Sequence, residues 1–194
     1  MPIVGDDSHY AYDEIAFATG VDLETYSQFI SVSLIDNTGE RDAWEHEVSA
    51  FGVDPDTFPK KEWPPYLHSD DWNPYLKLGT ELVTEWKQIT GSLIWWPIEG
   101  LPDKVNPNVF LTSPGWDLSG LIDHITSMLN EPGTVVYVHC APGADRTGAV
   151  HAAWLINQQG LDAKTALDEA AQATSAGAPS ADYRRLVAAY AAQR

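Results

Sequence analysis

The chain has 194 residues, 44% of them hydrophobic and eight of them tryptophan, which is enough apolar surface for one packed domain. Its 28 acidic and 11 basic side chains give a formal charge of −17 with no local run of Lys or Arg, so nucleic acid and anionic membranes are poor partners. A single cysteine excludes an internal disulfide and any zinc site that needs several thiolates.

Targeting and metal-binding signals are weak. No apolar run of about 18 residues could span a bilayer, and Met1–Asp7 lacks the charged and apolar regions of a signal peptide. We therefore expect a cytoplasmic protein and a monomer. The six histidines show no helical i, i+4 pair and no HExxH pattern, so no metal and no cofactor is expected.

The first 50 residues predict a strand, a helix, a strand and a helix. Residues 13–20 suit a short strand closed by glycine, and Asp22 can cap a short helix after it. The β-branched stretch 29–36 predicts a second strand, ended by turn-forming residues. Residues 41–50 then suit a helix.

The region 53–91 is interpreted as an insertion. Residues 54–74 are rich in proline and polar side chains, which is typical of a long irregular loop. Apolar residues recur at helical spacing over 76–89, so this stretch predicts a helix that Gly91 ends. The apolar run 92–98 predicts a strand.

A second loop, 99–116, precedes a predicted helix and the strand with the clearest sequence signal. Asp117 or Ser119 can cap a helix that reaches Asn130. The continuous apolar run 134–138 is typical of a strand buried on both faces of a parallel sheet.

Helices dominate the rest of the chain. Stretches after Arg146 predict helices over 146–159, 162–174 and 180–193. Strands separated by helices predict an α/β fold: a single domain over 1–194 with a central, mostly parallel sheet of four to five strands and helices on both faces.

The stretch from His139 to Gly148 carries the chemistry, because it lies between a buried strand and a helix. Loop amides and the helix N-terminus form a site that favours an anion such as phosphate. The same positive potential stabilises the thiolate of Cys140, which makes it a nucleophile. Arg146 can bind two phosphate oxygens with its planar fork and stabilise the transition state.

The neighbouring residues have supporting roles. Gly143 lets the backbone turn with its amides inward, and Gly148 lets the helix pack close to the sheet. Thr147 can donate its hydroxyl to the cysteine sulfur, and His139 orders the loop through hydrogen bonds. The expected phosphate-binding residues are Ala141, Pro142, Gly143, Ala144, Asp145 and Arg146.

His-Cys, five residues and Arg-Thr-Gly form the signature of the cysteine-dependent protein tyrosine phosphatase superfamily, and the chain resembles its dual-specificity members over 14–36 and 92–148. Residues 53–91 depart from that pattern. The resemblance implies a dual-specificity phosphatase-like fold and hydrolysis of phosphomonoesters through a cysteinyl-phosphate. The substrate could be a phosphotyrosine, phosphoserine or phosphothreonine protein, a small phosphorylated molecule or a lipid.

The resemblance also implies an acid on an upstream loop that protonates the leaving oxygen. Asp103 lies where the resemblance places it, Asp117 is better explained as a helix cap, and Glu99 sits close to the strand end. The Gly-x-Asp-Arg-Thr ending resembles bacterial tyrosine and lipid phosphatases and phosphoinositide phosphatases, and Asp145 either adds an acid or base or orients the loop.

Other interpretations stay open. Cys140 could be an inert buried thiol, the loop could belong to a non-catalytic phospho-binding module, or the chain could be a rhodanese-like or arsenate-reductase-like enzyme. The side chains of Trp95 and Trp96 are expected in the core. Those of Trp63, Trp72 and Trp116 could lie in the core or line a substrate pocket.

Overall fold

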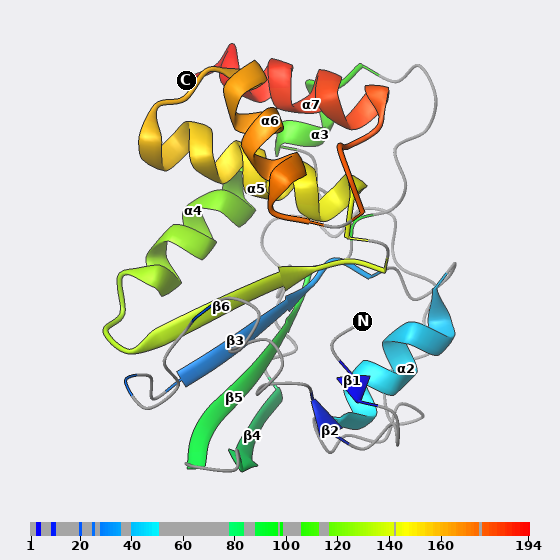
Figure 1. The fold of residues 1–194 in the computed structure, drawn as a ribbon, viewed down its shortest axis with the longest axis vertical. Coiled ribbons are helices and arrows are strands. Elements are labelled where there is room, and N and C mark those ends of the chain that lie inside the picture. The colour runs from blue at the N-terminus through cyan, green and yellow to red at the C-terminus, as the bar shows by residue number, and fades with distance from the viewer. Residues whose placement is uncertain are drawn as a thin grey trace.

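The protein, in a computed structural model, is built on one four-stranded sheet flanked by helices (Figure 1). The structure describes residues 3–4, 9–10, 20, 25, 28–35, 40–50, 78–83, 88–96, 98, 106–112, 117–141, 143–174 and 176–194. The predicted strand at 13–20 and most of the helix after Asp22 lie outside these residues, as does the loop at 54–74.

The sheet has the strand order β4-β5-β3-β6. Its parallel strands are β5 (Gln88–Trp95), β3 (Gln28–Ser33) and β6 (Thr134–His139), and β4 (Leu78–Val83) runs antiparallel to β5. The predicted α/β class with a mostly parallel sheet is therefore confirmed. The predicted strands at 29–36, 92–98 and 134–138 correspond to β3, β5 and β6. Residues 135–138 of β6 are only partly buried, so the expected burial of this strand on both faces is wrong.

The predicted helix at 76–89 is wrong, because this stretch holds β4 and the start of β5. Apolar residues four positions apart, such as Leu78, Leu82 and Trp86, share one face of a helix and equally one face of a strand. Periodicity alone could not separate the two structures. Backbone pairing between β4 and β5 decided for strands, as tertiary context often does.

The carboxyl ends of the three parallel strands meet at one edge of the sheet. Ser33 at the end of β3 pairs with Trp95 on one side and with His139 on the other. Backbone bonds carry the alignment further, since Leu34 N–H donates to the oxygen of His139 at 2.8 Å and Ile98 N–H donates to the oxygen of Leu34 at 3.3 Å. Loops that follow these strands are thus brought together.

The helices confirm most of the predictions for the rest of the chain. Asp117 caps α4, and Asp162 caps α6 by accepting from two backbone N–H groups in its first turn. Gly160 ends α5 in the left-handed conformation. The helices are α2 (Arg41–Ala50), α3 (Val109–Thr112), α4 (Leu118–Leu129), α5 (Asp145–Gln159), α6 (Ala163–Gln172) and α7 (Ala181–Ala191). A two-stranded antiparallel pair, β1 (Ile3–Val4) and β2 (His9–Tyr10), precedes them.

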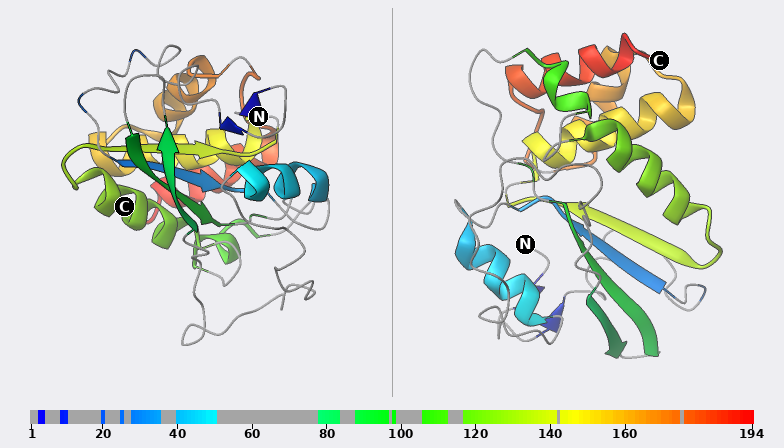
Figure 2. Two further views of the ribbon diagram at one scale, coloured as in Figure 1. Left: turned by 90° about the horizontal axis from the view of Figure 1, so that it is seen from below. Right: turned by 180° about the vertical axis from the view of Figure 1, so that it is seen from behind.

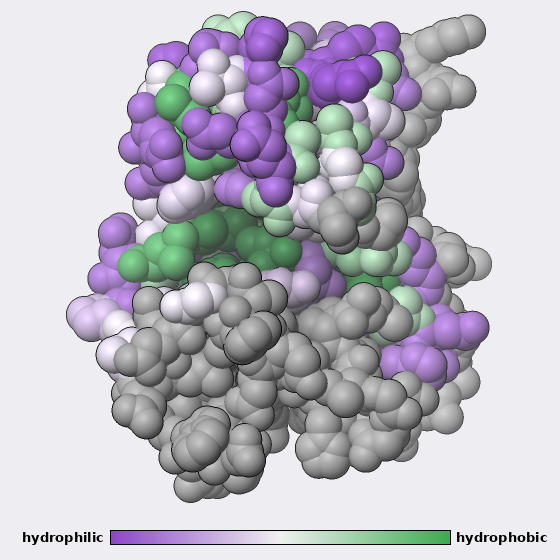
Figure 3. Space-filling view, in the orientation of Figure 1, coloured by the Kyte–Doolittle hydropathy of each residue, from purple (hydrophilic) through white to green (hydrophobic). Residues whose placement is uncertain are grey.

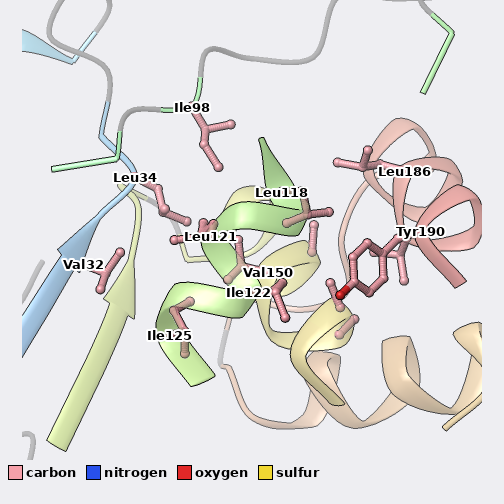
Figure 4. Packing of buried hydrophobic residues seen from close by; sticks show 14 of the residues in the cluster. Val32, Leu34, Ile98, Leu118, Leu121, Ile122, Ile125, Val150, Leu186 and Tyr190 are labelled. Atoms are coloured by element: carbon pink, nitrogen blue, oxygen red, sulfur yellow. The ribbon is translucent and has the colours of Figure 1, made fainter. Parts of the chain in front are cut away.

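The main core lies between one face of the sheet and helices α4, α5 and α7. Val32 and Leu34 point from β3 and its extension toward Leu121 and Ile122 of α4, and Figure 4 shows these side chains together. Trp96 is 2% exposed and belongs to this core, as predicted. Burial of these apolar side chains fixes where α5 begins relative to the sheet.

Side chains of helix α2 contact the opposite face of the sheet, and Figure 2 shows α2 beside the carboxyl ends of the strands. Successive residues of a strand point to opposite faces, so Trp95 faces α2 while Trp96 faces the core. The rings of Trp95 and Trp44 lie 5.1 Å apart, and Trp95 Nε1–H donates to the oxygen of Ile35 at 2.8 Å. Trp95 is therefore packed against α2 rather than fully buried.

None of the helices in the described part of the chain has the length and the apolar character that a membrane span requires.

Candidate active site

Cys140 lies at the edge where the parallel strands end. It directly follows β6, its side chain is 3% exposed, and it is a free thiol. In open α/β sheets, ligands bind in the crevice outside the carboxyl ends of the strands. The predicted nucleophile therefore occupies the place in the fold where a ligand site is expected.

The loop after Cys140 turns the chain into α5. Gly143 has a φ of +79°, a left-handed conformation that favours glycine, which confirms that the turn needs this residue. Ala144 is the N-cap of α5 and makes no side-chain capping bond, so no side chain of the cap covers the first N–H groups of this 15-residue helix. Such a helix start attracts an anion. Pro142 lies outside the described residues.

Arg146 points from the first turn of α5 to the ends of the neighbouring strands. Its Nη1 donates to the oxygens of Leu34 and Ile98 at 3.1 and 3.2 Å. Glu40 binds the same guanidinium through both carboxylate oxygens, at 2.7 Å from Nη1 and 2.5 Å from Nη2. The predicted phosphate clamp is thus held in one orientation over the carboxyl ends of β3 and β5.

Arg146 stays positively charged in this environment. Burial acts to lower the pKa of its guanidinium, but the hydrogen bond that it donates to Glu40 and the charges of Cys140 and Glu40 outweigh burial and raise the pKa above its usual value. Cys140 and Arg146 lie at the two ends of the same loop, Cys140 directly after β6 and Arg146 in the first turn of α5.

His139 makes hydrogen bonds, as predicted, on the face of the sheet that α2 contacts. Its Nε2 lies 2.7 Å from Oε1 of Glu47 and 3.1 Å from Oγ of Ser31, and all three side chains are buried. The ring also stacks on Tyr137, with centroids 5.3 Å apart. His139, the residue directly before Cys140, is therefore bonded to helix α2 through Glu47.

Asp145 and Gly148 connect the start of α5 to the start of α7. Oδ1 of Asp145 accepts from the N–H of Ser180 at 2.6 Å, which fits the orienting role among the two considered from the sequence. A Cβ at Gly148 would lie 2.7 Å from Cγ of Pro179. The close approach predicted for Gly148 is real, but the expected partner was wrong: it is the segment before α7 and not the sheet.

Thr147 does not bond the sulfur of Cys140 in this structure. Its hydroxyl is buried and makes no hydrogen bond, so the predicted bond to Cys140 is not formed. It lines a mostly apolar cavity of about 340 Å³ between α4, α5 and β6, which also holds Val138, His151 and Trp154. Figure 3 shows this hollow as a hydrophobic surface between the helices and the sheet. Neither Cys140 nor Arg146 lines it.

Replacing Thr147 by Val is expected to stabilise the fold by about 1 kcal/mol, because it removes a buried hydroxyl that has no partner and keeps the side-chain shape. The midpoint of urea unfolding would measure the change. Thr165→Val is the matched control, since Thr165 occupies the same position in the first turn of α6 but bonds Asp162 at 2.7 Å. A loss of stability in Thr147→Val equal to that of the control would contradict this prediction.

Of the three candidate acids, only Asp117 lies in the described part of the chain. Its Oδ1 accepts from the N–H of Gly120 at 3.0 Å, so it is the helix cap that the sequence suggested. Asp103 and Glu99 fall outside the described residues, as do Trp63, Trp72 and Trp116.

Glu40 and Glu47 are site residues that the sequence analysis missed. Glu40 directly precedes α2 and Glu47 lies within it, a stretch for which the sequence predicted only a helix. The carboxylates contact residues 106 and 92 positions away in the chain. No local pattern marks such distant partners.

Comparison with known proteins gives only distant likenesses. No protein-family model matches the chain, and no curated protein matches its sequence. The crystal structure of Tk-PTP in the active form is similar with a TM-score of 0.41 and 16% identity, covering 93% of this chain and 86% of that one. A structure that describes the PTPN18 fingerprint on distinct HER2 tyrosine phosphorylation sites has a TM-score of 0.40 and 12% identity, covering 94% of this chain and 63% of that one.

Proposed function

We propose that this chain is a cysteine-dependent phosphatase of the dual-specificity type, which hydrolyses phosphomonoesters through a cysteinyl-phosphate. One observation carries the proposal: Cys140 directly follows strand β6 and is 3% exposed, and the loop after it leads to Arg146 in the first turn of α5, whose N-cap makes no side-chain bond. A nucleophile, a fixed cation and free N–H groups at one place are the parts that phosphoryl transfer needs.

The reaction has two displacements. The Cys140 thiolate attacks phosphorus while the bond to the ester oxygen breaks, and Asp103 gives its proton to that oxygen. Water then attacks the phosphorus of the cysteinyl-phosphate, its proton passes to the Asp103 carboxylate, and the sulfur–phosphorus bond breaks to return the thiolate and release phosphate. Arg146 and the loop amides bind the non-bridging oxygens throughout. Assistance from Thr147 requires its hydroxyl to turn from the cavity toward the sulfur.

The proposed substrates are phosphorylated tyrosine, serine or threonine side chains of proteins, or a small phosphorylated molecule or lipid. The net charge of −17 favours substrates with few phosphates and disfavours nucleic acid. We further propose that the protein acts as a cytoplasmic monomer, with one domain over 1–194, and needs no metal.

The decisive test is hydrolysis of para-nitrophenyl phosphate by the wild-type chain with excess EDTA, from about pH 4.5 to about pH 8, where carboxylates and thiols change charge. Turnover with the chelator present is the expected result. Phosphate binding without turnover would instead support a phospho-binding module, and thiosulfate or arsenate turnover without phosphatase activity would support the other anion-processing enzymes.

Replacing Asp103 by Asn is expected to lower kcat by about 10²- to 10⁴-fold, the usual contribution of a general acid. The loss should be largest with a poor leaving group such as an alkyl phosphate, since that oxygen needs the proton most. Asp117→Asn is the control, because Asn also caps helices well and Asp117 serves as a cap. A large loss in Asp117→Asn alone would reassign the acid.

A further inference from the structure

The cavity of about 340 Å³ between α4, α5 and β6 borders the helix that begins at the Cys140 loop. One face of α5 lines it through residues at the spacing i, i+3, i+4 and i+7, namely Thr147, Val150, His151 and Trp154. Thr147 comes directly after Arg146 in the first turn of α5. Neither Arg146 nor the nucleophile lines the cavity, so a molecule bound there would not occupy the phosphate site.

Two residues on this face of α5 carry buried donors. Oγ1 of Thr147 and Nε1 of Trp154 are both buried, and neither makes a hydrogen bond to any part of the chain that the structure describes. An indole N–H can only donate, and a hydroxyl has one proton to donate. Burying such donors without an acceptor costs stability. A ligand that brings an acceptor oxygen into the cavity would remove that cost.

The rest of the lining is mainly aliphatic. Ile125 and Leu129 of α4 and Val136 and Val138 of β6 contribute to it. Figure 3 shows the hollow at the molecular surface, and the side chain of Leu129 is 41% exposed, so a ligand can enter from solvent. An apolar cavity of about 150 Å³ holds one benzene ring. The cavity beside α5 therefore has room for an apolar body of about two rings.

The described lining carries no charge at neutral pH. His151 is the residue in it that titrates closest to neutrality, and burial lowers the pKa of its imidazole, while the charge of Glu169 opposes this shift only in part. An anion or a cation would lose its hydration in this cavity and find no opposite charge among these residues. The lining therefore selects a neutral molecule.

We propose that this cavity binds a small neutral molecule with an apolar body of about two rings and a ketone or amide oxygen, and that its binding slows turnover. The effect on turnover rests on the proposed phosphatase function. The single hydroxyl proton of Thr147 can be donated to the ligand or to the sulfur of Cys140, but not to both. A bound ligand would thus withdraw the assistance that Thr147 gives when the thiolate leaves the cysteinyl-phosphate.

Binding is tested with α-tetralone, a two-ring ketone, and with tetralin, which has the same rings without the oxygen. The indole ¹H–¹⁵N signal of Trp154, assigned by its loss in Trp154→Phe, should shift and saturate as α-tetralone is added. The signal of Trp95 should stay in place, because its Nε1–H already donates to the oxygen of Ile35 at 2.8 Å. No saturable shift of the Trp154 signal would overturn the site.

The role of the donors is tested by comparing the two probes. Tetralin is the more hydrophobic molecule, so a cavity without active donors would bind it more tightly than α-tetralone. We expect α-tetralone to bind at least as tightly, and the ratio of the two dissociation constants to change about 10-fold against the ketone in Thr147→Val. Thr165→Val is the control that should leave this ratio unchanged, since Thr165 bonds Asp162 on α6. The same ratio in wild type and Thr147→Val would contradict donation by Thr147.

The effect on turnover is measured with para-nitrophenyl phosphate and saturating α-tetralone. We expect kcat to fall about 10-fold, as for the loss of one hydrogen bond, with unchanged affinity for inorganic phosphate. A burst of para-nitrophenol should precede the steady state, because the cysteinyl-phosphate then accumulates. An unchanged kcat under conditions that saturate the Trp154 signal would refute the link to turnover. Saturable binding by a chain that has no turnover even without the ligand would refute the phosphatase function alone.

Discussion

Cys140→Ser is expected to abolish hydrolysis of para-nitrophenyl phosphate, with kcat lower by at least about 10³-fold. A serine hydroxyl at neutral pH is a much weaker nucleophile than a thiolate, and no described residue bonds the Cys140 side chain as a base could. The measurement is steady-state turnover with excess EDTA, which also removes any contribution from a contaminating metallophosphatase.

The control for Cys140→Ser is binding of inorganic phosphate. The substitution leaves Arg146 and the start of α5 untouched, so the variant should bind phosphate about as well as the wild type, and its unfolding midpoint should change little because Ser is close to Cys in size. Turnover at the wild-type rate in Cys140→Ser would rule out a cysteinyl-phosphate. If Cys140→Ser lost both phosphate binding and folding, Cys140→Ala would replace it in the test. Alanine has no polar side-chain atom, so it avoids burying an unpaired hydroxyl at a position that is only 3% exposed.

Arg146→Lys is expected to lower kcat/KM by about 10²- to 10³-fold although the positive charge remains, a loss typical of one oriented transition-state donor. The ammonium of Lys is a point charge and cannot bind Glu40, the strand-end oxygens and a phosphate at the same time. Most of the loss should appear in kcat, because the aligned pair of donors matters most when the phosphoryl group becomes planar in the transition state. Measuring kcat and KM separately tests this.

Arg184→Lys is the matched control, since Arg184 is exposed on α7 and far from the strand ends in sequence. It should leave both kcat and the unfolding midpoint unchanged. A similar small effect of both substitutions would mean that Arg146 contributes only charge, which would contradict the clamp. Because Arg146 is itself 9% exposed, the folded fraction of Arg146→Lys has to be measured by circular dichroism alongside turnover.

The arrangement around Arg146 explains why the site needs a sheet with this strand order. Its Nη1 bonds the oxygen of Leu34 after β3 and the oxygen of Ile98 after β5, while Cys140 follows β6. A change of pairing partner for any of these strands would remove one side of the site. Strand order therefore contributes directly to the position of the guanidinium.

The segments that the sequence predicted best depend on local interactions. The strand over 134–138, the turn at Gly143 and the helix that begins beside it all follow from neighbouring residues: a continuous apolar run, a glycine with positive φ and a stretch with high helix propensity. Asp162 caps its own helix for the same reason. These contacts join residues within a few positions, so the spacing of residue types determines them.

Tertiary structure alone decided the rest. Leu78 and Leu82 fit a helix or a strand equally well, and only pairing with β5 selected β4. The partner of Gly148 proved to be Pro179, because α7 folds back over α5. Glu40 and Arg146 are 106 residues apart, and they meet because parallel strands align their carboxyl ends and α2 packs on one face. The sequence by itself thus pointed to Cys140, Arg146 and the loop between them as the candidate site, whereas the carboxylate that binds Arg146 could be found only once distant segments were brought together.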